Sequence, residues 1–63
     1  MPIIQVNMIE GGTDQQKEDL IEAIATAVMS SIGAPEENIR VIINETEKRH
    51  WGIGKLPAHK AGR

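Results

Sequence analysis

The sequence predicts a small α/β protein built as a β-strand, a crossover helix and a second, parallel β-strand, and three observations predict it. The chain has 63 residues, enough for one domain and too few for two. Two β-branched segments, residues 3–9 and 39–45, flank a segment of helical periodicity, residues 14–32. No internal repeat interrupts this order. We therefore expect one domain over residues 1–63, ending in a short hairpin or arm at 48–63.

The first strand is expected at residues 3–9, where apolar and polar residues alternate. Ile4, Val6 and Met8 fall on one face at a period of two. The sequence Glu-Gly-Gly at 10–12 then predicts a turn.

The helix is expected at residues 14–32. Thr13 stands at the cap position with Gln16 three residues later, which is the pattern of a capping box. Apolar residues then recur at steps of three and four along one face, namely Leu20, Ile21, Ile24, Ala25, Val28 and Ile32. Gly33, with Pro35 just beyond, predicts the end of the helix.

The second strand, residues 39–45, is reached by a connection long enough to be a crossover, so the two strands should be parallel. One helix covers only one face of a two-stranded sheet. Simple alternation leaves Ile3, Ile9 and Ile42 on the other face. We expect that face to meet another subunit, with two units forming a four-stranded sheet with two helices.

Composition excludes several classes of function. The chain has no Cys, which removes thiol catalysis and thiolate metal sites. No tract approaches the ~18 apolar residues of a membrane span, so we expect no membrane partner and a cytoplasmic location. All nine acidic residues lie within 1–47, whereas 48–63 carries five bases and no acid. Trp51 is the only aromatic residue beside those bases, so we expect no nucleic-acid partner; the basic segment is either a solvated terminus or an attractor of small anions.

Ordinary catalytic and metal-binding patterns are missing from the sequence. His50 and His59 are nine residues apart on an irregular segment, so we interpret both as surface histidines and expect no metal site. Gly52-Ile53-Gly54 lacks the third glycine of a nucleotide fingerprint and predicts a turn.

Met1-Pro2 is the unusual dipeptide, because removal of the initiator methionine leaves a proline with a free secondary amine. An α-amino group titrates at about 7.7–8.0, and aliphatic surroundings or a nearby cation favour its neutral, basic form. Arg40 should lie at the same sheet edge as Pro2, since both begin parallel strands. It is a candidate carboxylate clamp. The structural alternatives are that Pro2 only starts an edge strand, that Arg40 reaches solvent or pairs with an acid, and that Trp51 anchors the tail rather than capping a pocket.

Together these residues resemble the 4-oxalocrotonate tautomerase family. The resemblance rests on Pro2, Glu10-Gly11, Ala34-Pro35, the strand Ile39-Arg40-Val41-Ile42-Ile43 and the segment His50-Trp51-Gly52-Ile53-Gly54, and it runs from Pro2 to about Lys55. It implies the βαβ tautomerase fold, a homo-oligomer that is usually a hexamer, no metal or organic cofactor, and a small anionic keto or enol acid as substrate.

The resemblance also implies a role for each residue. Pro2, freed of Met1, would be the general base that takes a proton from an enol oxygen and returns it to carbon. Arg40 would bind a substrate carboxylate, in such enzymes from a neighbouring subunit. Trp51 stands where the family commonly has an aromatic residue lining the pocket that keeps the proline amine neutral.

One departure concerns the catalytic arginine that the family carries directly after the Glu-Gly pair, where this chain has Gly12. Lys17, Arg49 or an arginine of another subunit are the candidate replacements. Two alternatives stay open beside a tautomerase of altered substrate preference. One is a hydratase or dehalogenase-like member of the same superfamily. The other is a weakly active subunit that needs a partner chain to supply the arginine.

Overall fold

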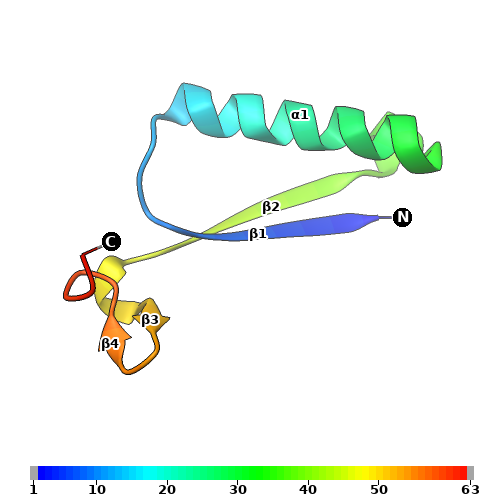
Figure 1. Ribbon diagram of the computed structural model, residues 1–63. Helices are drawn as coiled ribbons and strands as arrows, with labels where there is room; N and C mark the ends of the chain where they lie inside the picture. The colour runs from blue at the N-terminus through cyan, green and yellow to red at the C-terminus, as the bar shows by residue number, and fades with distance from the viewer. Residues whose placement is uncertain (1, 63) are drawn as a thin grey trace.

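The chain forms one strand–helix–strand unit with a short hairpin attached (Figure 1). The computed structural model describes residues 2–62. The expected removal of Met1, and Arg63 at the end of the arm, lie outside the described residues.

The predicted α/β class with a βαβ unit is confirmed. Strand β1 (Ile3–Ile9) leads into helix α1 (Asp14–Ile32), which returns the chain to strand β2 (Arg40–Thr46) beside β1. The two strands are parallel, with Ile3 paired to Arg40 and Ile9 to Thr46. In Figure 1 the helix lies along one face of this pair and leaves the other face open.

Strand β2 begins and ends one residue later than the expected 39–45. A single 3₁₀ turn, Glu36–Asn38, precedes it. Ile39 donates its backbone N–H to the Glu36 carbonyl of that turn, at 3.1 Å, so the turn and not the strand uses this donor. The strand therefore begins at Arg40.

Both ends of α1 are fixed as the sequence predicts. The Thr13 hydroxyl accepts the backbone N–H of Gln16 at 3.1 Å, and the Gln16 amide oxygen accepts the backbone N–H of Thr13 at 2.9 Å. At the other end Gly33 adopts a left-handed conformation, φ 70°, and donates its N–H to the Met29 carbonyl at 3.1 Å. These contacts satisfy backbone groups that a helix end otherwise leaves open.

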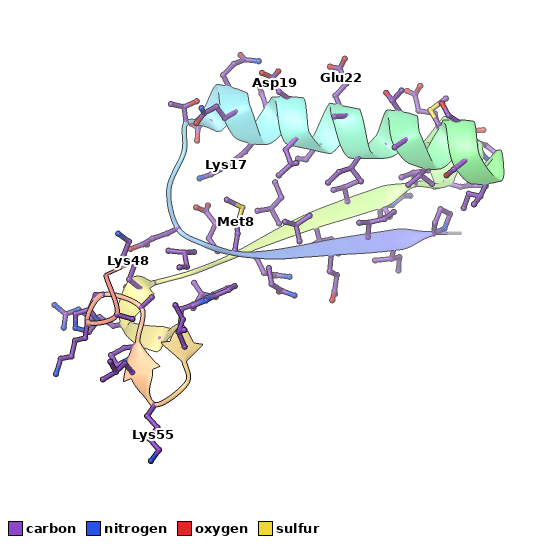
Figure 2. The ribbon with its side chains drawn as sticks, in the orientation of Figure 1. Met8, Lys17, Asp19, Glu22, Lys48 and Lys55 are labelled. Atoms are coloured by element: carbon purple, nitrogen blue, oxygen red, sulfur yellow. The ribbon has the colours of Figure 1, made fainter. Side chains whose placement is uncertain are left out.

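Side chains alternate between the two faces of the sheet along each strand, so the two faces differ in exposure. Ile4, Val6 and Met8 are half-buried beneath the helix, and Figure 2 shows Met8 pointing toward it. On the open face Ile3 is 59% and Ile42 is 42% exposed. The apolar surface expected on the second face of the sheet is therefore present.

The sheet does not cover the whole apolar stripe of α1. Ile21 and Ile32 are exposed, because the stripe is wider than the two-stranded sheet beneath it. Within residues 2–62 the only buried residues are Ile39 and Ala58. A compact chain of this length has a radius of gyration of about 11 Å and exposes roughly 4,000 Å². This chain has 14.6 Å and 4795 Å², so its fold leaves unusually much surface uncovered.

The basic segment forms a 3₁₀ turn and a small hairpin. The turn spans Lys48–His50, and strand β3 (Gly52–Ile53) pairs antiparallel with β4 (Leu56–Pro57). Ala58 closes the hairpin by donating its N–H to the Trp51 carbonyl at 2.7 Å. Figure 1 shows this hairpin projecting from the end of the sheet that is far from the N-terminus.

Candidate active site

Pro2 and Arg40 lie at the edge of the sheet where both long strands begin, here called the amino edge. The Arg40 backbone N–H donates to the Pro2 carbonyl at 3.1 Å, and Arg40 is the register partner of Ile3. Pro2 is half-buried and Arg40 is exposed. The parallel topology thus brings together the two residues that the sequence singled out as base and clamp.

The Arg40 guanidinium is held by backbone carbonyls. Its Nη1 donates to the Glu37 carbonyl at 2.8 Å and to the Ile39 carbonyl at 3.1 Å. No carboxylate of residues 2–62 lies within 4.0 Å of it. A guanidinium has five N–H donors, so the Nε and Nη2 side remains available for a planar carboxylate.

Trp51 lies at the other end of the sheet, here called the carboxyl edge. It follows the 3₁₀ turn after β2, and its side chain is half-buried. At about 3.3 Å per residue, the first and last residues of β2 are about 20 Å apart. Figure 1 shows the N-terminus and the hairpin at opposite ends. One chain therefore does not bring Trp51 to Pro2.

Gly12 also lies at the carboxyl edge, in the loop after β1. Its φ is +77°, and a Cβ built there would lie 3.1 Å from the Gln16 amide oxygen. That oxygen is fixed by the capping box of α1. This conformation suits glycine and strains other residues. The loop is thus shaped around the glycine rather than around an arginine.

Glu45 ties this loop and the helix to β2. Its Oε1 is 2.7 Å from Lys17 Nζ, and its Oε2 accepts the backbone N–H of Gly11 at 3.2 Å. The hydrogen bond from Lys17, followed by that from Gly11, lowers the pKa of the Glu45 carboxyl, and the hydrogen bond to Glu45 raises the pKa of Lys17. Lys17 is consequently engaged in an ion pair within its own chain.

A shallow charged cavity of about 260 Å³ lies at the carboxyl edge, and sequence reasoning missed it. Its walls are Glu10, Glu47, Lys48, Arg49 and His59. The one signal in the sequence was the concentration of bases in 48–63. Which bases face a cavity depends on how the hairpin folds back.

Residues 2–62 contain no helix that is long and apolar enough to cross a membrane. In the same range no three His, Asp or Glu side chains come together as a metal site would require. His50 stands 3.9 Å from Glu47 through Nδ1, and both side chains are exposed.

The fold and its edges define a class of small βαβ proteins in which a proline and an arginine begin the two parallel strands. The family model described as tautomerase enzyme matches residues 2–60. A 2-hydroxymuconate tautomerase of Pseudomonas sp. (strain CF600) is 51% identical over 63 residues, covering 100% of both chains.

Solved structures agree with this match. A structure from work on the 4-oxalocrotonate tautomerase isozymes of Methylibium petroleiphilum has a TM-score of 0.91 at 45% identity, covering 98% of this chain and 100% of the other. A structure from work on a heterohexamer 4-oxalocrotonate tautomerase of Chloroflexus aurantiacus J-10-fl has a TM-score of 0.89 at 28% identity, covering 95% and 97%.

The chain belongs to the tautomerase family. It is an isomerase of the 4-oxalocrotonate tautomerase type. The resemblance expected from Pro2, Arg40 and the flanking motifs is confirmed at the level of the family.

Proposed function

We propose that this protein interconverts the enol and keto forms of a small unsaturated 2-hydroxy or 2-oxo acid, with 2-hydroxymuconate as the first substrate to test. The observation that carries the proposal is the backbone hydrogen bond that sets Pro2 beside Arg40 at the amino edge. The name of the Pseudomonas relative supports the choice of substrate.

Pro2 acts as the general base once Met1 has been removed. Its secondary amine takes the proton of the enol hydroxyl, so an O–H bond breaks while an N–H bond forms. The electron pair moves through the conjugated system to carbon, which receives a proton back from the ring nitrogen. The carbonyl is then complete and the amine is restored. No oxidant, reductant or bound group is consumed, and general-base catalysis of this kind contributes about 10²–10⁴ in rate.

Arg40 binds a carboxylate of the substrate and stabilises the charge that develops as the proton moves. The two donors of its Nε and Nη2 side match the two oxygens of a carboxylate. The carbonyls of Glu37 and Ile39 hold the other end of the guanidinium. A guanidinium fixed in this way is already oriented before the substrate binds. It therefore stabilises the developing charge with little reorganisation of the site.

The complete site is shared between chains in this proposal. Trp51 lines the pocket, but it lies at the carboxyl edge of its own chain, about 20 Å from the amino edge. A neighbouring chain that places its carboxyl edge against the first chain's amino edge would supply it. Each chain then contributes Pro2 to one site and Trp51 to another.

The uncovered surface supports an assembly of such chains as a homo-oligomer, which we propose to be a hexamer. The open sheet face carries Ile3 and Ile42, and the flank of α1 carries exposed Ile21, Met29 and Ile32. Several large apolar side chains exposed on neighbouring surfaces are typical of subunit interfaces. Pairing two βαβ units edge to edge gives a four-stranded sheet with two helices.

A second arrangement is favoured by one observation, the left-handed conformation of Gly12, which opposes an arginine at this position. In it, a different chain of the same fold supplies the missing arginine, and the subunit described here is weakly active alone. Native mass spectrometry of the protein from its source tests this, because a second kind of chain in the assembly would support it. Full activity of an assembly made of this chain alone would oppose it.

The experiment for the main proposal replaces Pro2 by Ala and follows ketonisation of 2-hydroxymuconate by its ultraviolet absorbance. Ala leaves a primary amine at the terminus, so we expect kcat/KM to fall by about 10- to 100-fold rather than to zero. Glu22→Ala is the control, since Glu22 is exposed on the outer side of α1, away from the amino edge (Figure 2). Equal rates for the Pro2→Ala variant and the unaltered chain would overturn the role of Pro2.

A further inference from the structure

Among residues 2–62 Arg40 is the one cation at the amino edge, so within this chain a cation for a second substrate carboxylate has to come from the carboxyl edge. The loop at Gly12 does not supply one. Its φ of +77° and the 3.1 Å approach of a built Cβ to Gln16 Oε1 oppose an arginine at this position.

Lys17 is the nearest cation to that loop along the chain, and it is already engaged. Its Nζ lies 2.7 Å from Glu45, and the same carboxylate also accepts the Gly11 N–H. Redirecting Lys17 to a substrate would break its ion pair with the carboxylate that also anchors Gly11. Lys17 therefore holds the loop in place and is a poor candidate for binding substrate.

Arg49, unlike Lys17, has no ion-pair partner among residues 2–62 and does not hold the loop at Gly12 in place. It is exposed and lines the cavity of about 260 Å³ at the carboxyl edge. Within residues 2–62 neither Arg49 nor Lys48 has a carboxylate partner within 4.0 Å, although Glu10 and Glu47 line the same cavity. Arg49 also belongs to the turn that leads directly into Trp51. Any assembly that brings Trp51 to the amino edge of a neighbour brings Arg49 with it.

Lys48 lies in the same cavity, so the chemistry of the two side chains decides between them. The guanidinium presents two parallel N–H donors to a carboxylate, whereas the ammonium is a strongly hydrated point charge. Lys48 also begins the turn, three positions before Trp51, and its carbonyl accepts the Trp51 N–H at 3.4 Å. Arg49 therefore has the better donor geometry for a carboxylate and is closer to Trp51 along the chain.

We infer that Arg49 binds the second carboxylate of a dicarboxylic enol, the one that Arg40 of the other edge does not hold. This inference rests on the proposed function, because it places Arg49 in the same shared site. It assigns the chain its own replacement for the arginine missing at Gly12. The protein then selects dicarboxylates over monocarboxylates without a second kind of chain.

The test compares two inert ligands that differ only in the second carboxylate. The dicarboxylate is trans,trans-muconate, and sorbate is the monocarboxylate with the same six-carbon diene. Dissociation constants are measured by calorimetry on the assembled protein from which Met1 has been removed. We expect the unaltered chain to bind muconate at least about 10-fold more tightly than sorbate, as one charge-assisted pair allows.

Arg49→Ala should reduce this preference to less than about 3-fold, and Arg49→Lys should restore part of it. Lys55→Ala is the matched control for charge, because Lys55 points away from the protein at the tip of the hairpin (Figure 2). It should leave the preference unchanged. An unaltered chain without preference would overturn the inference, as would a preference that survives Arg49→Ala or is lost only in Lys48→Ala.

Turnover is measured on the same samples with 2-hydroxymuconate and with the monocarboxylate phenylenolpyruvate. If neither enol reacts, the proposed function fails, whatever the binding ratio is. If both react and Arg49→Ala lowers kcat/KM for both equally, the proposed function survives and the assignment of Arg49 fails. A loss of kcat/KM that is confined to the dicarboxylate supports both the proposed function and the assignment of Arg49.

Discussion

Replacing Gly12 by Arg introduces the residue that the family resemblance implies after the Glu-Gly pair, yet we predict that it destabilises this protein. The left-handed φ of +77° is free for glycine and unfavourable for a residue with a Cβ. The new Cβ would also press on the Gln16 amide oxygen at 3.1 Å. That oxygen accepts the Thr13 N–H and completes the capping box of α1.

The two effects can be added. A non-glycine residue in a left-handed conformation costs roughly 1–2 kcal/mol, and weakening one half of a helix cap costs about 0.5–1 kcal/mol. The sum is about 2 kcal/mol, which for a chain of this size lowers Tm by roughly 8–16 °C. The charge of the arginine adds little here, because the loop is exposed.

Thermal unfolding followed by circular dichroism measures this loss. Gly12→Ala should lose nearly as much Tm as Gly12→Arg, since both carry a Cβ. Gly12→Asn should lose less than half as much, because asparagine tolerates the left-handed region. A Gly12→Arg variant as stable as the unaltered chain would refute the argument from loop conformation, and so would equal losses for Ala and Asn.

Two further predictions concern the ion pair and the open sheet face. Lys17 and Gly11 lower the pKa of Glu45 below its ordinary 4.5, so its contribution to stability is present above pH 4.5 and is lost as the pH falls through the lowered pKa. The Tm difference between the unaltered chain and Glu45→Gln should accordingly be constant near neutral pH and shrink in acid; a difference unchanged to pH 2 would contradict this. Ile42→Lys places a charge on the open face, and size-exclusion chromatography should show a smaller assembly, while Asp19→Lys, on the outer side of α1, should leave the size unchanged. An Ile42→Lys assembly of full size would show that this face is not an interface.

The strand–helix–strand order could be predicted because local signals and tertiary packing agree. Alternation at 3–9, the capping box at Thr13 and the left-handed Gly33 each act within a few residues. The start of β2 could not be placed to the residue, since Ile39 is apolar and suits a strand. Its N–H is nevertheless taken by the preceding turn.

The candidate site could be predicted in part, because parallel topology alone places Pro2 beside Arg40. The sequence does not show that the loop at Gly12 adopts a left-handed conformation or that Lys17 is bound by Glu45. Both depend on contacts between residues far apart in the chain. The cavity beside Arg49 depends likewise on the folded hairpin. These contacts separate Lys17 from Arg49 as candidate replacements for the missing arginine, which the sequence left equal.

The most direct test of the central claim, catalysis by the free amine of Pro2, ties each rate to a known amino terminus. Preparations with different degrees of Met1 removal are weighed by intact mass spectrometry and assayed with 2-hydroxymuconate on the same day. The account predicts a ketonisation rate proportional to the fraction of chains that lack Met1, with none from chains in which an amide bond occupies the proline nitrogen. A rate independent of that fraction would contradict it.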